Sequence, residues 1–447
     1  MADIVWGPQT IILLLGTGLF LSFRLRFAQL RRLGFSFRML TRRSRIGETQ
    51  KGKIGDVSPF QALTISLATV VGNGNIAGVA TAIAMGGPGA VFWMWLSATL
   101  GMATKMIEAV LGQKFREKLP DGSMAGGPMY YLRNGLGLAW LAGAYALFMS
   151  CKATIATPLI QSNSIAIAMS SEFGIKPWMR GLGLAVFTWL VIVGGIKTLG
   201  KVTEILSPLM VLLYVSGGII TIIIFASNLP QALEMIFVGA FKPSAFGGGV
   251  VGITIANAMR YGMARGNYSN EAGIGTAAVF HAAAKTNEPA RQGFLGSLDV
   301  FIDTMVICTL TALAILTSGA WTQGTSTAMT ASAYNQAIPQ IGGLIVAASS
   351  FLFGYSSLIG VTYYGKIALS HLLGPWIHKP YNWIYCIFIV VGATIKVEVA
   401  WSVGDLVNGL MILTNLIGVL GLSGLAVGII RSYGRRLDLA ERPNLPS

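Results

Sequence analysis

The sequence predicts an all-α polytopic membrane protein with eleven transmembrane helices, and three observations support this. Of the 447 residues, 53% are hydrophobic and only 11% are charged, whereas a soluble domain carries about 25% charged residues. Eleven apolar runs are long enough to cross about 30 Å of hydrocarbon. Two of these runs contain matching strings rich in glycine and asparagine. The composition therefore excludes a water-soluble enzyme.

The eleven apolar runs follow one another along the chain. The first run has no charge from Ile4 to Phe23 and follows Asp3, so it lacks the basic leader of a secretory signal and is expected to stay as a span. The predicted spans lie at residues 4–24, 58–86, 88–113, 136–170, 180–197, 203–227, 249–283, 293–318, 340–370, 381–400 and 403–430. The 56 glycines favour close packing of these helices.

The positive charges lie on one side of the predicted membrane. The connection from Arg24 to Asp56 has ten Lys or Arg residues and two acids, and alternate connections keep this excess. That side has 24 of the 32 basic residues. Because cytoplasmic loops are enriched in Lys and Arg, we expect an outside N-terminus and a cytoplasmic C-terminus in the plasma (inner) membrane. Topology thus explains the net charge of +15, and the expected partner is the lipid bilayer rather than nucleic acid.

The glycine- and asparagine-rich strings form an internal repeat. The second span contains Asn75-Ile-Ala-Gly-Val-Ala-Thr-Ala, and the seventh contains Asn270-Glu-Ala-Gly-Ile-Gly-Thr-Ala. An odd number of spans separates the copies, so they cross the membrane in opposite directions. This indicates a secondary transporter with an inverted 5+5 repeat after one N-terminal helix. The expected division is an N-terminal helix and basic connection at 1–57, and repeats at 58–227 and 228–447.

Both copies are predicted to break their helices. Gly72-Asn-Gly-Asn interrupts the second span, and the stretch from Gly262 to Gly275 interrupts the seventh. Backbone groups freed at mid-membrane must line a polar cavity, so paired breaks indicate a substrate site. Freed N–H groups suit a carboxylate, whereas freed carbonyls suit an ammonium group. The predicted substrate-binding residues are Gly74, Asn75, Ala77, Gly78, Gln161, Asn270, Glu271 and Gly273.

Several ionisable residues lie inside the predicted spans, where each charge costs about 2.5–3.5 kcal/mol. Lys105 and Glu108 are three residues apart on one helical face and are expected to neutralise each other. Asp299 and Asp303 are expected to form structural ion pairs, while the role of Lys152 is open. The candidate partners of the two aspartates are Arg260, Arg265, Lys285 and Arg291.

No enzyme motif accompanies these features. The sequence has no HExxH, P-loop or GxSxG string, and Cys151, Cys308 and Cys386 show no metal-ligand spacing. An ion channel is a second class, but channels generally build their pore from several subunits. No protein partner is evident.

Specific strings place the chain near a known family. Gly86-Gly-Pro-Gly-Ala-Val-Phe-Trp-Met-Trp-Leu-Ser-Ala-Thr-Leu-Gly resembles the signature of the alanine or glycine:cation symporters, and Gly126-Gly-Pro-Met-Tyr-Tyr, Ser269-Asn-Glu-Ala-Gly-Ile-Gly and Phe301-Ile-Asp-Thr fit the same family. The resemblance covers essentially the whole chain. It implies sodium-coupled uptake of alanine or glycine, with the inverted-repeat core of the neurotransmitter:sodium symporters. Glutamine, serine or a D-amino acid as substrate, and protons as coupling ion, remain alternatives.

A sodium site is expected on the ninth span. The Phe353 carbonyl and the Ser356 and Ser357 hydroxyls stand at i, i+3 and i+4 on one helical face, and such hard oxygens suit a hard cation. The string is similar to the hydroxyl-bearing segment of core helix 8 in the neurotransmitter:sodium symporters. The resemblance implies that carbonyls of Gly72 and Asn75 complete the site.

Overall fold

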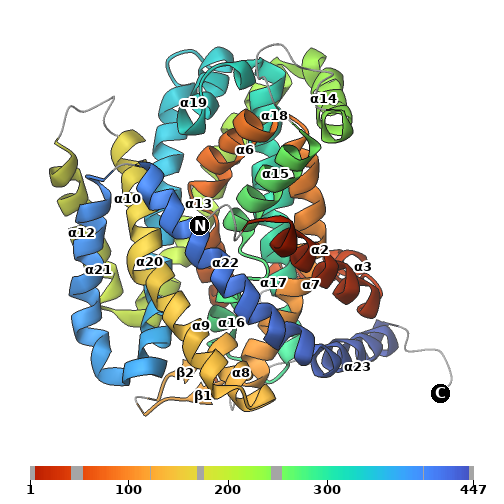
Figure 1. The fold of residues 1–447 in the computed structure, drawn as a ribbon, viewed down its shortest axis with the longest axis vertical. Coiled ribbons are helices and arrows are strands. Elements are labelled where there is room, and N and C mark those ends of the chain that lie inside the picture. The colour runs from red at the N-terminus through yellow and green to blue at the C-terminus, as the bar shows by residue number, and fades with distance from the viewer. Residues whose placement is uncertain are drawn as a thin grey trace.

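The structure is a computed structural model that describes residues 6–41, 54–120, 122–168, 176–242, 254–395 and 397–441. These residues form a bundle of long helices with a few shorter ones at its ends (Figure 1). The described strands are β1 (Glu117–Lys118) and β2 (Met124–Ala125), an antiparallel pair in which Glu117 lies opposite Ala125. The all-α class is therefore confirmed.

The helices of the first half are α2 (Pro8–Arg24), α3 (Ala28–Arg31), α4 (Leu33–Thr41), α5 (Pro59–Val70), η1 (Gly74–Gly78), α6 (Val79–Gly86), α7 (Ala90–Lys114), α8 (Pro128–Leu136), α9 (Ala139–Cys151), η2 (Lys152–Ala156), α10 (Thr157–Ala168), α12 (Pro177–Ile192), α13 (Gly195–Ile224), η3 (Ala226–Asn228) and α14 (Leu229–Phe241). Those of the second half are α15 (Ile255–Asn270), α16 (Thr276–Ala282), α17 (Pro289–Val300), η5 (Phe301–Cys308), α18 (Thr309–Ser318), η6 (Ala320–Thr322), α19 (Ser326–Ala337), α20 (Gly342–Leu373), η7 (Pro375–Ile377), α21 (His378–Gly392), α22 (Val397–Gly421) and α23 (Ser423–Glu441).

Six of the described helices are long and apolar enough to cross a membrane, and the bent pair Pro59–Val70 and Gly74–Gly86 forms a seventh candidate. The six lie at Ala90–Lys114, Ala139–Ala166, Gly195–Ile224, Pro289–Ser318, Gly342–Leu373 and Trp401–Gly421. The helices Pro8–Arg24 and Pro177–Ile192 are apolar but shorter. The protein is thus a polytopic membrane protein, while the count of eleven spans stays a prediction.

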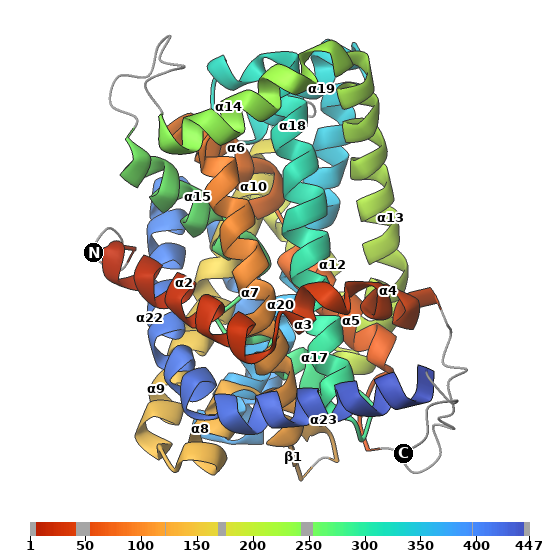
Figure 2. The ribbon, with the colours of Figure 1, turned by 90° about the vertical axis from the view of Figure 1, so that its right-hand side faces the viewer.

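The last predicted span differs from the structure. The apolar run at 403–430 is divided, because α22 ends at Gly421 and α23 turns away across the end of the bundle (Figure 2). The predicted connections also contain helices that the hydropathy pattern did not reveal, namely α14 and α19. Both are too short to span the bilayer.

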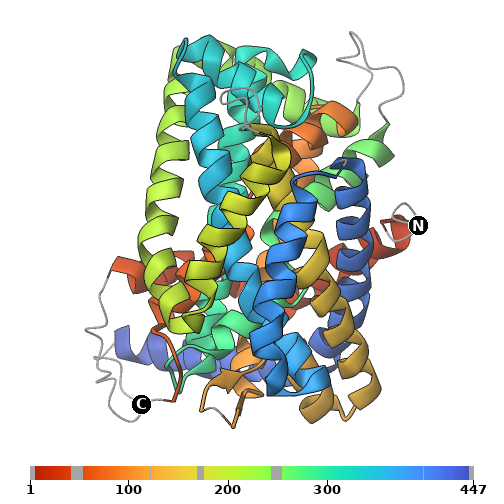
Figure 3. The same cartoon turned by 90° about the vertical axis from the view of Figure 1, so that its left-hand side faces the viewer.

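Two long helices, α7 and α20, pack against the interrupted helices. Helix α7 packs against α15, α16 and α17, while α20 packs against α5, α10 and α13. On the outside, α12 packs against α21 (Figure 3). The outer surface of α13 is apolar, since Ile205 is 73% exposed and Leu212 is 68% exposed, as expected for a lipid-facing helix.

The first interrupted helix has a well-defined start. Pro59 occupies the first turn of α5, and the Ser58 hydroxyl accepts a hydrogen bond from the Gln61 N–H while the Gln61 side chain accepts one from the Ser58 N–H. This capping box satisfies donors that α5 would otherwise leave free. The capping box therefore stabilises the start of α5, one helix length before the break that follows Val70.

Candidate functional site

The first break lies where the sequence predicted it. Helix α5 ends at Val70, and the chain resumes as the π-helical turn η1, which continues into α6; the η1–α6 segment is bent by 51° from α5. Val71, Gly72 and Asn73 separate the two parts, and all three are buried. The last carbonyls of α5 therefore point to the protein interior, where the negative end of the helix dipole favours a cation.

Asn73 fixes this break to two neighbouring helices. Its Nδ2 donates to Gln161 Oε1 on α10 at 3.0 Å, and its Oδ1 accepts a hydrogen bond from Ser350 Oγ on α20 at 2.5 Å. Gln161, a predicted substrate contact, therefore bonds to the break itself. A Cβ atom added to Gly354 would come within 2.8 Å of Asn73 Nδ2, so a glycine is needed where α20 passes the break.

The second break lies further along than predicted. Helix α15 continues through Gly262, Gly266 and Asn267 to Asn270, so the expectation of a break throughout 262–275 is wrong in its first half. The chain leaves the helix where Glu271, Gly273 and Gly275 have φ values of 54°, 89° and 94°. Residues in the left-handed region cannot continue a right-handed helix.

Side chains from the surrounding helices bind the carbonyls of the second break. The Asn270 carbonyl accepts from Lys105 Nζ at 2.6 Å, the Gly273 carbonyl from Asn415 Nδ2 at 2.8 Å and the Ile274 carbonyl from the Tyr145 hydroxyl at 2.8 Å. These carbonyls were expected to be open to a ligand. The structure shows that they already have donors, which stabilise the broken backbone in a buried setting.

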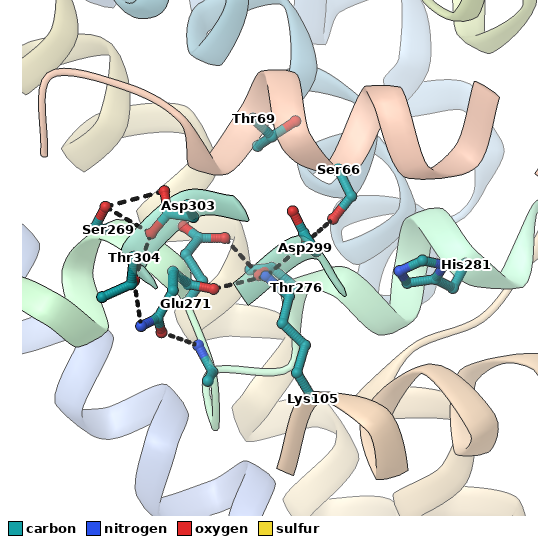
Figure 4. Close-up of polar contacts among 12 residues, drawn as sticks. Ser66, Thr69, Lys105, Ser269, Glu271, Thr276, His281, Asp299, Asp303 and Thr304 are labelled. Carbon is teal, nitrogen blue, oxygen red and sulfur yellow. Dashed lines mark hydrogen bonds and ion pairs between the residues drawn. The ribbon is translucent and has the colours of Figure 1, made fainter. Parts of the chain in front are cut away.

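Glu271 has a partner that the sequence left open. Lys152, on the π-helical turn η2, forms a buried ion pair and hydrogen bond with Glu271. The other Glu271 oxygen accepts a hydrogen bond from Thr276 Oγ1 at 2.5 Å (Figure 4). Lys152 therefore links the α9–η2–α10 segment to the second break. Its positive charge balances the negative charge of Glu271.

Asp303 joins the two breaks. Asn75 Nδ2, from η1, donates to Asp303 Oδ1 at 2.7 Å, and Ser269 Oγ, from the end of α15, donates to both Asp303 oxygens at 3.0 and 2.9 Å. Thr304 Oγ1 adds a further hydrogen bond at 2.8 Å (Figure 4). Asp303 is fully buried and forms no ion pair with any described residue. Its carboxyl group is thus held only by neutral donors.

Two of the predicted ion pairs are wrong in their partners. Lys105 pairs with Asp299 across the core, with Nζ 2.8 Å from Oδ2, and Ser66 Oγ donates to the same Asp299 oxygen at 2.6 Å (Figure 4). Glu108 instead accepts a hydrogen bond from Asn415 Nδ2 at 2.6 Å. Helical spacing suggested a local pair, but Asp299 approaches Lys105 from α17, a contact that spacing along one helix does not reveal.

The basic residues proposed for the two aspartates also lie elsewhere. Arg265 pairs with Asp405, with Nη2 2.9 Å from Oδ2, and its guanidinium lies 4.6 Å from the centre of the Trp401 ring. Arg260 stacks on Tyr261. Among the described ion pairs, none joins Asp299 or Asp303 to Arg260, Arg265, Lys285 or Arg291; Asp299 pairs with Lys105 instead.

Three π-helical segments carry the polar residues of this centre. They are η1 with Asn75, η2 with Lys152 and η5 with Asp303. A π-helical turn widens the helix by one residue and is frequent at functional sites. These π-helical segments were not predicted from the sequence.

The amides predicted to hold a carboxylate are engaged. The N–H groups of Ala77 and Gly78 both donate to the Asn73 carbonyl, at 2.8 and 3.3 Å, so they are not free as expected. A Cβ added to Gly78 would nevertheless meet no atom within 4 Å, although Gly78 is buried. Gly74 differs, since a Cβ there would come within 3.1 Å of the Tyr268 ring. The backbone at Gly78 therefore leaves open space the size of a methyl group.

The predicted sodium ligands are only partly brought together. Ser357 Oγ donates to the Thr69 carbonyl at 2.9 Å and lies 2.7 Å from the position of a Cβ on Gly72. Ser356 Oγ donates to the Phe353 carbonyl of its own helix at 2.9 Å.

Asn75 bonds to Gly72 but does not offer its own carbonyl to this group. Its Oδ1 accepts a hydrogen bond from the Gly72 N–H at 3.0 Å, and its N–H donates to the Gly72 carbonyl at 3.1 Å. Its carbonyl accepts a hydrogen bond from Thr311 Oγ1 at 2.9 Å, and its Nδ2 donates to Asp303. Asn75 therefore connects Gly72, next to Ser357 and Thr69, with Asp303.

Residues that the sequence did not single out complete the centre. Asn73 lies in the same glycine–asparagine string as Asn75, so its position was a usable signal. Ser269 begins the family string that contains Asn270, so its position was a signal as well. Thr69 and Asn415 offered none, because isolated hydroxyl and amide residues in apolar helices are common and generally satisfy their own helix.

Comparisons with known proteins agree with this geometry. The profile of the sodium:alanine symporter family matches residues 1–446. The sodium/alanine symporter AgcS of Methanococcus maripaludis is 41% identical over 438 residues, covering 96% of this chain and 95% of the relative. The "Probable sodium/glutamine symporter GlnT" of Bacillus subtilis is 36% identical over 447 residues, covering 99% and 91%.

Solved structures show the same fold at low sequence identity. MhsT in complex with L-phenylalanine superposes with a TM-score of 0.50 at 13% identity, covering 84% of this chain and 100% of that one. A manganese transporter of Eremococcus coleocola gives 0.51 at 14% identity, covering 90% and 94%. Together with the match along the whole sequence, these findings show that the chain belongs to the sodium:alanine symporter family and is a transporter rather than an enzyme.

Proposed function

We propose that the protein couples the inward movement of sodium to the uptake of small neutral amino acids, alanine or glycine, by alternating access. The observation that carries this proposal is the contact of Asp303 with both broken helices, through Asn75 and Ser269. A ligand that changes one break therefore changes the hydrogen bonds of the other. Such a shared element is what coupling of two ligands to one conformational equilibrium requires.

We propose that the amino acid lies beside Gly78, where a Cβ would meet no atom within 4 Å. The positive dipole end of the η1–α6 segment favours its carboxylate near Gly74, Ala77 and Gly78. Its ammonium group is expected near the side chains of Asn75 and Gln161, since the Asn270, Gly273 and Ile274 carbonyls already have donors. Asp303 supplies negative charge to balance the positive charge of the ligands.

The sodium ion is proposed at the carboxyl end of α5. The Thr69 carbonyl and the Ser357 hydroxyl meet there beside Gly72, and the helix dipole adds negative potential. The Gly72 carbonyl, which accepts a hydrogen bond from the Asn75 N–H at 3.1 Å, is proposed as a further ligand. This replaces the Asn75 carbonyl of the expected site by that of Thr69. Phe353 lies one turn before Ser357 on α20, and its carbonyl accepts a hydrogen bond from the hydroxyl of Ser356, the residue next to Ser357.

The finer topology is also a proposal. We propose eleven spans, with the segment 1–57 followed by repeats at 58–227 and 228–447. The N-terminus is proposed outside and the C-terminus in the cytoplasm, with the protein in the inner membrane. This orientation places the basic connections on the cytoplasmic side. A cysteine introduced in the basic connection should react with an impermeant thiol reagent only after the cells are opened.

A second substrate, glutamine, is favoured by the similarity to GlnT. Uptake into proteoliposomes decides between them. We expect labelled alanine or glycine to accumulate only with an inward sodium gradient, and glutamine to compete weakly. Accumulation of glutamine alone would show that glutamine, not alanine or glycine, is the substrate. Uptake that is independent of sodium and driven by a proton gradient would show that the coupling ion is the proton.

A further inference from the structure

Helix α23 crosses the end of the bundle (Figure 2). A basic hollow of about 160 Å³ lies between the α2–α3 corner and α23. Helix α2 ends at Arg24 and α22 ends at Gly421, so the hollow is at the level where two apolar helices stop. We assign this level to the lipid headgroups, because apolar membrane helices end there.

Arginine dominates its lining. Five guanidinium groups and one carboxylate line the hollow, which leaves an excess of four positive charges; they belong to Arg26, Arg31, Arg32, Arg431, Arg435 and Asp438. Asp438 forms an ion pair with Arg32, with Oδ1 2.8 Å from Nη2. Within the described part of the chain, the guanidinium groups of Arg26 and Arg435 have no hydrogen-bond or ion-pair partner, and both residues are exposed.

The backbone is bent to form this corner. Arg26 and Phe27 have φ values of 53° and 55°, in the left-handed region that non-glycine residues rarely adopt. Each such residue is strained, so the surrounding packing must hold it. Arg431 contributes by donating to the Arg24 carbonyl at 2.5 Å, which ties α23 to the corner.

Apolar surface adjoins the charges. Leu25, Phe294 and Ile430 line the base of the hollow. Nearby, Phe23 is 63% exposed and Leu439 is 73% exposed, and such side chains are expected to face hydrocarbon. The site therefore offers a phosphate-binding group of arginines next to an acyl-chain surface.

We propose that this hollow binds the phosphodiester headgroup of an anionic glycerophospholipid, with its acyl chains along the adjoining apolar surface. The planar guanidinium group matches phosphate oxygens in pairs, so unpaired arginines at headgroup depth favour a phosphate over a diffuse counter-ion. Basic pockets of this kind between membrane helices bind anionic lipids. The site lies outside the transport centre and does not depend on the transported substrate.

The test measures binding of fluorescent phosphatidylglycerol to the full-length protein in neutral detergent. The double variant Arg26→Gln/Arg435→Gln should weaken binding by about fivefold for each arginine, about 25-fold in all. The matched control is Lys197→Gln/Lys201→Gln, which removes two exposed positive charges from α13 outside the hollow and should change binding less than twofold. Asp438→Asn should strengthen binding, because it releases Arg32.

Two further arms identify the ligand. A phosphatidylcholine probe should bind at least tenfold more weakly than phosphatidylglycerol, and soluble glycerol phosphate in excess should not displace the lipid. Displacement by glycerol phosphate would mean a site for small anions and would overturn the lipid assignment. Equal losses in the arginine and lysine doubles, or unchanged binding in the arginine double, would overturn the site itself.

Discussion

The proposed sodium site makes a quantitative prediction for two adjacent serines on α20. Ser357→Ala removes a hydroxyl that donates to the Thr69 carbonyl at 2.9 Å and faces the break at Gly72. A hydrogen bond or ligand contact to a charged group contributes about 1.5–3 kcal/mol, which corresponds to about a 10- to 150-fold change in an equilibrium constant. The sodium concentration for half-maximal alanine uptake should rise by that factor.

Ser356→Ala is the matched control. Its hydroxyl donates to the Phe353 carbonyl in the same helix at 2.9 Å, so its removal should raise the half-saturating sodium concentration less than about threefold. Initial uptake is measured in proteoliposomes across a range of sodium concentrations. Alanine affinity at saturating sodium should change little in either variant. A double variant with the sodium dependence of the unmodified protein would refute this placement and move the ion towards Asp303 or Glu271.

Four other predictions follow from the same structure. Gly78→Leu should abolish alanine binding in a protein that stays folded, because a Cβ there meets no atom within 4 Å and the added side chain would enter the space proposed for the substrate; unchanged affinity would move the substrate elsewhere. Lys105→Met should destabilise the fold by about 3–5 kcal/mol by leaving Asp299 unpaired, and Lys105→Met/Asp299→Leu should recover most of it in thermal unfolding; no recovery would argue against the pair. Lys152→Gln should stop uptake by leaving Glu271 unpaired, and Lys152→Gln/Glu271→Gln should restore part of the uptake because it removes both charges; a double variant as inactive as the single one would argue against a role for the pair. An inside-negative potassium potential should speed uptake, since one sodium per zwitterion moves one charge worth about 2.3 kcal/mol per 100 mV; an unchanged rate would exclude one-to-one coupling.

The sequence predicted the helical breaks better than their contacts. Glycine and asparagine weaken a helix through local conformational freedom, which is readable from the residues at 72–75. In the second copy the glycines at 262 and 266 instead serve close packing, since a Cβ on Gly262 would come within 2.2 Å of the Ala90 carbonyl oxygen. The two uses of glycine have the same sequence pattern, so the start of the second break was placed too early.

Partners between distant helices could not be predicted. Lys105 pairs with Asp299, and Lys152 pairs with Glu271, across separations that depend on how the bundle closes. Helical periodicity relates only residues within one helix, and it therefore favoured Glu108 as the partner of Lys105. The hydroxyls around Asp303 were likewise invisible, because they become a cluster only when η1, α15 and η5 meet.

The central claim is that sodium and the amino acid stabilise the same arrangement of the two broken helices. Equilibrium binding to the purified protein tests it directly, by measuring the alanine dissociation constant with and without sodium and the sodium dissociation constant with and without alanine. Linkage requires both ratios to be equal, and we predict that each ligand tightens the other by the same factor, at least fivefold. An alanine dissociation constant that does not change with sodium would contradict coupling through these breaks.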